Sequence, residues 1–197
     1  MYADLHGDPF SQILWLTGQS NSNFKMDNAL KDKIVVGATA VLVREGLQNW
    51  SVDRVAAEVG CAKGLIAYYH GTKKSLLAAV ALHLGRRRLA GRLAALQGSG
   101  ADALDRLWQT LVDEVRAGEW AAWAALTAEP GIDTQADSAV DVAAFSTAVG
   151  RVLEVPPFRP EEVRLMTAAL DGFQVALHSG APENGIREAY HRLWLSV

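Results

Sequence analysis

One short segment combines a cationic hydrogen-bond donor, a position without a side chain and two large apolar surfaces. These are supplied by Lys63, by Gly64, and by Leu65 and Tyr68. Their spacing places them, with Ala67, on the outer face of a short helix. In the DNA major groove, a lysine can donate to O6 and N7 of guanine, and an apolar side chain can contact the methyl group of thymine. A glycine lets the backbone come close to the duplex. These residue types therefore suit contacts to base edges, if other elements hold the helix at the surface.

The elements that would hold this helix lie between residues 51 and 69, where the sequence predicts two short helices joined by a tight turn. Ala56 is small enough for a steep helix crossing, and Gly60 can adopt the positive φ of the turn. Ser51 can cap the first helix, and Trp50 stands where a hydrophobic staple would fix its start. The predicted inward positions are Val52, Val55, Val59, Cys61, Ile66 and Tyr69. The pattern indicates a helix-turn-helix that binds DNA, and the alternative is a helical hairpin that packs and binds nothing.

Flanking segments extend this pattern on both sides. Apolar residues from Leu30 to Leu42 recur at helical spacing, and Gly46 is typical of a helix C-terminus. Thr72 can cap a long helix that carries Lys73 in its first turn. The segment from about Asp27 to Leu89 resembles the DNA-binding domain of the tetracycline-repressor (TetR) family of transcriptional regulators. The resemblance rests on Arg44-Glu45-Gly46-Leu47, on Val55-Ala56-Ala57-Glu58-Val59-Gly60, on Lys63-Gly64 with Tyr68-Tyr69-His70, and on Thr72-Lys73-Lys74-Ser75-Leu76-Leu77.

The resemblance implies an all-α protein with an N-terminal three-helix helix-turn-helix domain, followed by an α-helical ligand-binding and dimerisation domain. We expect the first domain at residues 26–72 and the second at 73–197, after an N-terminal extension, 1–25, of unknown role. Apolar residues of the extension, from Phe10 to Leu16, are expected on an apolar surface of this subunit or its neighbour. The implied function is a homodimeric repressor that reads an inverted-repeat operator in double-stranded DNA through residues 62–69 and is released by a small hydrophobic inducer.

The expected DNA-binding residues are Ser51, Lys63, Gly64, Leu65, Tyr68, Tyr69 and Lys73. The two tyrosines would contact phosphates or base edges, although Tyr69 also occupies a packing position. Lys73, with the positive end of its own helix, would bind a phosphate. The chain departs from the family pattern at Ala62, where a serine or threonine is common, so the helix loses a side-chain cap. Leu65, Ala67 and His70 also replace the usual hydroxyl residue, tyrosine and phenylalanine.

Charge is divided unevenly along the chain. From Met26 to Arg92 there are eleven Lys and Arg against five Asp and Glu, whereas residues 93–197 have seven against fifteen. The net charge of −3 thus conceals a basic first half, which would be attracted to phosphates, and an acidic second half. The run Arg86-Arg87-Arg88 is typical of a solvated helix face.

Composition and motifs limit the other function classes. No apolar run approaches the roughly 20 residues that span a bilayer, and we expect a cytoplasmic protein without a membrane partner. The single cysteine, Cys61, allows no disulfide within the chain. Catalytic motifs are absent and the five histidines are scattered, so we expect neither an enzyme, nor a cofactor, nor a metal site. A helical protein-interaction module that has lost sequence-specific DNA binding is the alternative, favoured by Ala62, Leu65 and Ala67.

Turn-forming residues divide the second half into helices, at Gly98-Ser99-Gly100, Ala117-Gly118, Pro130-Gly131, Pro156-Pro157 and Gly180 with Pro182. Near the end, an apolar stripe recurs at steps of three and four. The expected dimer interface is Val163, Met166, Leu170, Phe173, Leu177, Ile186, Tyr190 and Leu193. Small residues at Ala169, Gly172 and Ala176 form a second strip on the same helix. The alternative is that both strips serve the subunit's own core.

A small-molecule site is expected among the middle helices, as in the family. The expected ligand-binding residues are Trp108, Leu111, Trp120, Trp123, Phe145, Asp171 and His178. Aromatic residues at helical spacing also occur as plain core. A polar line beside the apolar stripe runs through Arg164, Thr167, Asp171, Gln174 and His178. The first expectation is that this line faces water. The alternatives are that it pairs across a dimer or that it forms hydrogen bonds to a ligand.

Overall fold

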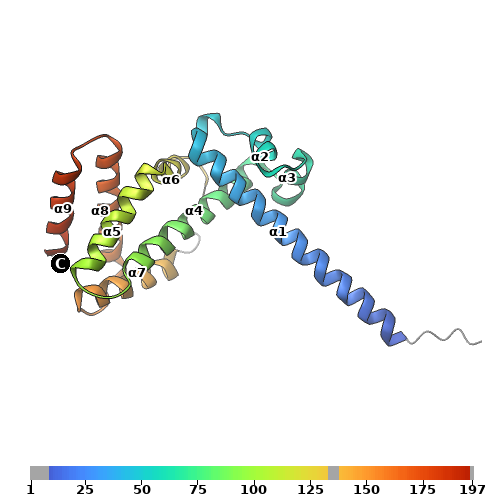
Figure 1. The fold of residues 1–197 in the computed structure, drawn as a ribbon, viewed down its shortest axis with the longest axis horizontal. Helices are drawn as coiled ribbons and strands as arrows, with labels where there is room; N and C mark the ends of the chain where they lie inside the picture. The colour runs from blue at the N-terminus through green and yellow to red at the C-terminus, as the bar shows by residue number, and fades with distance from the viewer. Residues whose placement is uncertain (1–8, 133–137, 196–197) are drawn as a thin grey trace, which may run out of the picture.

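The computed structural model describes residues 9–132 and 138–195; of residues 9–27 and 138–140 only the backbone is described. Within these ranges the chain forms helices and no strand, which confirms the all-α prediction (Figure 1). The helices are α1 (Pro9–Asn49), α2 (Val52–Val59), α3 (Lys63–His70), α4 (Lys73–Ala95), α5 (Ala101–Arg116), α6 (Glu119–Thr127), α7 (Ser138–Leu153), α8 (Pro160–His178) and α9 (Glu183–Leu195).

The first helix is longer than the sequence indicates. α1 begins at Pro9, so that most of the expected N-terminal extension continues the helix and projects away from the body (Figure 1). At Gly46 the backbone leaves the helical region, with φ 72° and ψ 165°, as expected for a helix end. The expectation that residues 10–16 lie on an apolar surface concerns side chains outside the described part of the chain.

The predicted caps and turns are confirmed at the helix-turn-helix. Ser51 Oγ accepts a hydrogen bond from the backbone N–H of Arg54 at 3.3 Å, and Gly60 adopts the left-handed conformation with φ 70° and ψ 41°. Ala62 gives α3 no side-chain cap. Thr72 Oγ1 accepts from the backbone N–H of Ser75 at 3.0 Å and so starts α4. Local sequence therefore sets where α2 begins and ends and where α4 begins.

Two hydrophobic cores divide the described chain. The first joins α1, α2, α3 and the N-terminal half of α4 to α6; its buried residues include Ile34, Leu42, Trp50, Val55, Ile66, Leu76, Leu84 and Leu126. The second joins the C-terminal end of α4 to α5, α7, α8 and α9; its buried residues include Leu96, Leu107, Leu111, Phe145, Val149, Leu170 and Tyr190. α4 runs between the helix-turn-helix and the other helices (Figure 1) and contributes to both cores.

The apolar stripe that was expected at a dimer interface packs instead in the second core. Val163, Met166, Leu170, Ile186 and Tyr190 are buried within the single chain. The remaining members, Phe173, Leu177 and Leu193, are half-buried, the first two against the same core. The buried members cannot offer a surface to a second subunit, so the alternative of an internal core holds for this stripe. The regular spacing of apolar residues in this stripe predicts a buried helix face, but it does not indicate whether the same chain or a second chain covers that face.

The connection between α1 and α2 is fixed by a buried tryptophan and a close helix crossing. Trp50 is 2% exposed, and its indole Nε1 donates a hydrogen bond to the carbonyl oxygen of Ala38 at 2.9 Å. At the crossing, the buried side chain of Val59 lies against the bare Cα of Gly37. A Cβ atom at residue 37 would lie 2.5 Å from Cγ2 of Val59, well inside van der Waals contact.

Gly37→Ala is expected to destabilise the protein by roughly 1–3 kcal/mol, because overpacking at Val59 outweighs the better helix propensity of alanine. Urea unfolding measures the change. Gly91→Ala in α4 is the matched control, since its Cβ would meet Thr110 Cγ2 at an ordinary 3.7 Å. A Gly37 variant as stable as the Gly91 variant would show that the crossing tolerates a methyl group.

Candidate nucleic-acid interface and ligand pocket

The outer face of α3 is exposed, as its sequence predicts. Tyr68 is 75% exposed and Leu65 38%, while Ile66 on the opposite face is buried in the first core at 2%. Lys63, Gly64 and Ala67 are exposed as well. A Cβ atom at Gly64 would meet nothing within 4 Å, so the glycine leaves an open place in the surface. One helix face thus anchors α3 and leaves the other available to a partner.

Lys63 is already paired within the helix-turn-helix. Its Nζ lies 2.8 Å from Oδ1 and 2.9 Å from Oδ2 of Asp53 on α2. Both side chains are largely exposed, at 61% and 71%. An exposed ion pair of this kind contributes at most about 1 kcal/mol, so a base or phosphate can replace the carboxylate at small cost.

Tyr68 and Tyr69 are neighbours with different surroundings. Their rings meet edge to face, with centroids 5.0 Å apart. Tyr69 is half-buried against the first core, which fits the packing position that the sequence left open for it. Tyr68 carries the exposed ring of the pair. Of the two, Tyr68 is the one whose ring is placed for contact with another molecule.

Lys73 occupies the first turn of α4, directly after the Thr72 cap. It is exposed, and its Nζ lies 5.6 Å from the ring centroid of Trp50, a cation–π contact that orients the side chain. The backbone N–H groups at a helix start and a nearby lysine are groups that suit an anion, which is what the sequence predicts for Lys73. Ser51, also expected at the interface, is half-buried, and its hydroxyl caps α2.

The basic first half offers less free charge than its composition indicates. Arg88 and Arg92 are buried, at 6% and 7% exposure, so the interpretation of residues 86–88 as a solvated face is wrong for Arg88. Arg87 pairs with Glu119 at 2.5 Å. Nearer the helix-turn-helix, Arg44 pairs with Glu45 and Glu58, and Arg54 pairs with Glu45. DNA would therefore meet a surface of ion pairs together with exposed lysines.

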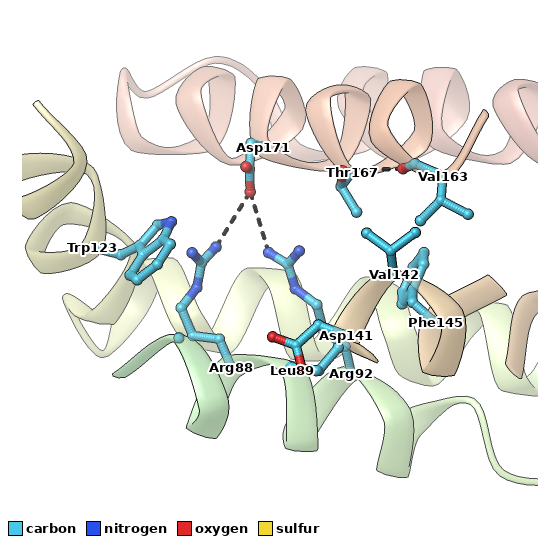
Figure 2. A pocket seen from close by; sticks show the side chains of 11 residues that line it. Arg88, Leu89, Arg92, Trp123, Asp141, Val142, Phe145, Val163, Thr167 and Asp171 are labelled. Atoms are coloured by element: carbon cyan, nitrogen blue, oxygen red, sulfur yellow. Dashed lines mark hydrogen bonds and ion pairs between the residues drawn. The ribbon is translucent and has the colours of Figure 1, made fainter. Parts of the chain in front are cut away.

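The buried arginines belong to a polar cluster that links α4, α5 and α8. Arg88 Nε donates to Glu114 Oε2 at 3.0 Å, and Arg92 Nη2 lies 3.3 Å from the same oxygen. Both Nη2 groups donate to Gln174 Oε1 at 2.9 Å. Asp171 Oδ1 bridges the two guanidinium groups at 3.3 Å each (Figure 2). Gln174 has no exposure at all, so the expectation that this polar line of α8 faces water is wrong for Gln174, whereas Arg164 and His178 of the same line are exposed.

Burial and charge act against each other on the titratable groups of this cluster. Burial would raise the pKa of Glu114, but Arg92 and Arg88 outweigh it and hold the pKa below its usual value. Burial and the neighbouring Arg92 lower the pKa of Arg88. The cluster therefore keeps Glu114 ionised and places a positive potential around it.

A cavity of about 250 Å³ adjoins the cluster (Figure 2). Its walls are Gly85, Arg88, Leu89, Arg92, Trp123, Asp141, Val142, Phe145, Val163, Thr167 and Asp171. Of the residues expected to bind a ligand, Trp123, Phe145 and Asp171 meet here. Trp108 and Leu111 are instead buried in the second core.

The last two expected ligand residues, Trp120 and His178, stack on one another, with ring centroids 5.1 Å apart, and do not line the cavity. Sequence reasoning missed Arg88 and Arg92 as pocket residues. The available signal was their spacing of four on a helix, opposite an aspartate and a glutamine three residues apart on another.

A metal site and a membrane span are two further possibilities for the described residues. No group of three or more His, Cys, Asp or Glu side chains is arranged to hold a metal ion there. None of the helices described in that part of the chain combines the length and the apolar character needed to cross a bilayer.

Known proteins share both the helix-turn-helix sequence and the overall fold of this chain. Residues 34–80 match the family described as bacterial regulatory proteins, tetR family. No curated protein matches the sequence. Among solved structures, the multidrug binding protein EbrR, complexed with imidazole, is 24% identical with a TM-score of 0.60, and the match covers 82% of this chain and 88% of that one.

Two further structures extend the same fold. A Rhodococcus sp. protein assigned to the TetR-family transcriptional regulators is 21% identical with a TM-score of 0.64, covering 86% of this chain and 98% of its own. A transcriptional regulator assigned in Pseudomonas aeruginosa PAO1 is 22% identical with a TM-score of 0.58, covering 84% and 88%. The fold likeness thus runs along most of the chain, and the family match covers its helix-turn-helix. The helix-turn-helix segment of this chain, residues 34–80, is similar to the tetR family of bacterial regulatory proteins.

Proposed function

We propose that the protein is a homodimeric repressor that binds an inverted-repeat operator through α3 and leaves it when a small molecule enters the cavity at Arg88 and Arg92. The observation that carries the proposal is the exposed outer face of α3, where Lys63, Gly64, Leu65 and Tyr68 stand clear of the chain's own core. A helix held in this way can insert into the major groove.

A second exposed surface supports dimerisation. On α8, Leu165 is 73% exposed and Val175 53%, with Gly172 exposed between them and nothing within 4 Å of its Cβ direction. These residues and Ala168 recur at steps of three and four on the side away from the second core. An apolar strip with a glycine at its centre allows another helix to approach closely. We place the dimer interface on this strip, which includes one of the small residues noted in the sequence.

Two subunits joined there would present two α3 helices, which suits two half-sites on one DNA duplex. We keep the division into a DNA-binding domain, 26–72, and a ligand-binding and dimerisation domain, 73–197, as a division of roles, since the first core also takes in residues of α4 and α6. The positions of α4 and α6 support an allosteric coupling between the cavity and the helix-turn-helix. Arg88 on α4 and Trp123 on α6 line the cavity, while Leu84 and Leu126 of the same two helices are buried in the first core. A ligand that moves either helix would change the affinity for DNA.

Lys63→Ala is expected to weaken binding to the cognate operator by roughly 1–3 kcal/mol and to relax selection at one base pair, because the guanine contact is lost. Asp53→Asn is expected to strengthen binding to scrambled DNA about two- to fivefold, since it releases the Lys63 ammonium group. Gel-shift titrations on an operator selected from random duplexes measure both. Arg164→Ala on the remote helix α8 is the control. If the wild-type protein bound no duplex at low salt, the result would contradict the proposal and favour the alternative, a helical protein-interaction module.

Lys73→Ala is expected to weaken binding to every duplex alike, because a phosphate contact carries no sequence information. The slope of log affinity against log salt should become shallower by about one unit. Binding measured over a range of salt concentrations tests this on cognate and scrambled DNA. If the loss fell on the cognate sequence alone, Lys73 would be reading a base.

Val175→Glu is expected to convert the dimer to a single chain, because two carboxylates would be buried at the strip. Sedimentation equilibrium gives the mass, and operator affinity should fall together with dimerisation. Val36→Glu on α1 is a matched control, since Val36 has a nearly equal exposure of 52%. A Val175 variant that keeps twice the mass of one chain would place the interface elsewhere.

A further inference from the structure

We propose that the cavity binds a small aromatic monocarboxylate, whose carboxylate displaces Asp171 from between Arg88 and Arg92. The inference rests on the proposed function in one respect, that this cavity is where the inducer enters. It adds the chemical class of the inducer, which from the sequence alone is expected only to be small and hydrophobic. It also assigns to Asp171 the position that the carboxylate of the ligand would occupy.

The first support is an excess of hydrogen-bond donors on the cavity wall. The bonds that the arginines make within the described residues use Nε and Nη2 of Arg88 and Nη2 of Arg92. Nε of Arg92 is also without an acceptor in the described structure, but it is buried beneath the wall, as is the unpartnered Oε1 of Glu114. The Nη1 groups of both side chains are likewise without a bond to those residues. A guanidinium group has five N–H donors in a planar fork that matches a carboxylate, so the pair can bind another one.

The second support is the loose fit of Asp171. It reaches the guanidinium groups with Oδ1 alone, at 3.3 Å from each Nη2, whereas charge-assisted hydrogen bonds to carboxylates usually measure about 2.7–2.9 Å. The side chain is 45% exposed, unlike Arg88, Arg92 and Glu114, which are all nearly buried. Figure 2 shows it reaching from α8 to a point between the two arginines. Asp171 can therefore turn to water at little cost and leave its place to a ligand.

Charge balance selects an anion with one charge. Arg88 and Arg92 carry two positive charges, Glu114 cancels one of them, and Asp171 cancels the other. With Asp171 turned outward, a single carboxylate takes its place between the two guanidinium groups, whereas the same two groups repel an amine at that position. Asp141 lines the same cavity and repels a second negative charge. A dicarboxylate is therefore disfavoured as well.

The rest of the wall selects the remainder of the ligand. Trp123 and Phe145 supply aromatic faces, and Leu89, Val142 and Val163 supply aliphatic contacts. Arg88 lies over the ring of Trp123, with its central carbon 5.3 Å from the centroid. At about 250 Å³, the cavity is smaller than most drug-binding pockets, which favours a ligand with a single ring.

The test compares phenylacetate with phenylacetamide, which has the same shape and no charge, and with 2-phenylethylamine, which has a similar length and a positive charge. Titration calorimetry on the full-length protein at pH 7 is expected to show phenylacetate binding at least about tenfold more tightly than the other two, which corresponds to about 1.4 kcal/mol. Asp171→Ala is expected to raise the affinity for phenylacetate several-fold and to leave that for phenylacetamide unchanged, because it removes the internal competitor. Asp113→Ala, an exposed aspartate of α5, is the control.

Equal or tighter binding of the amide or the amine overturns the inference, as does an Asp171 variant whose selectivity matches that of the Asp113 variant. Absence of phenylacetate binding at millimolar concentration also overturns it. None of these results touches the proposed function, which operator binding tests separately. Conversely, carboxylate selectivity in a protein that binds no DNA would support the inference and contradict the proposed function.

Discussion

The position of α4 is the constraint on which the other features depend. Its N-terminal half is buried among α1, α2 and α3, its C-terminal end is buried among the helices of the second core, and Arg88 and Arg92 project from it into the polar cluster. Only two residues lie between the end of α3 and the start of α4, so the position of α4 constrains that of α3. A rigid helix with both ends buried converts a shift at one core into a tilt at the other.

Local features of the sequence predicted the helix-turn-helix well. Ser51, Gly60 and Thr72 act through contacts within three or four residues, and such contacts can be read from the order of the residues. The exposed face of α3 followed from the same reasoning, since Ile66 must point inward if Lys63 and Tyr68 point outward.

Features set by contacts distant in sequence could not be predicted in the same way. The stripe from Val163 to Leu177 is equally regular whether its own chain or a second one covers it, and only the packing of α8 shows that its own chain does. Arg88 reads as part of a surface run, because Glu114 and Gln174, which make its burial tolerable, follow it by 26 and 86 residues. The inclusion of α6 in the first core was likewise invisible to local patterns.

Leu126 of α6 and the nearby Ile132 are buried against the residues that support the helix-turn-helix. The three N-terminal helices therefore do not enclose a complete interior by themselves. A chimaera that transferred only these helices to another regulator would expose the hydrophobic surface that α6 covers here. The transferred helices would keep their packing only if the recipient protein supplied a complementary helix. Exchange of helix-turn-helix domains between such proteins is thus limited by how well α6, which lies outside that domain, packs against it.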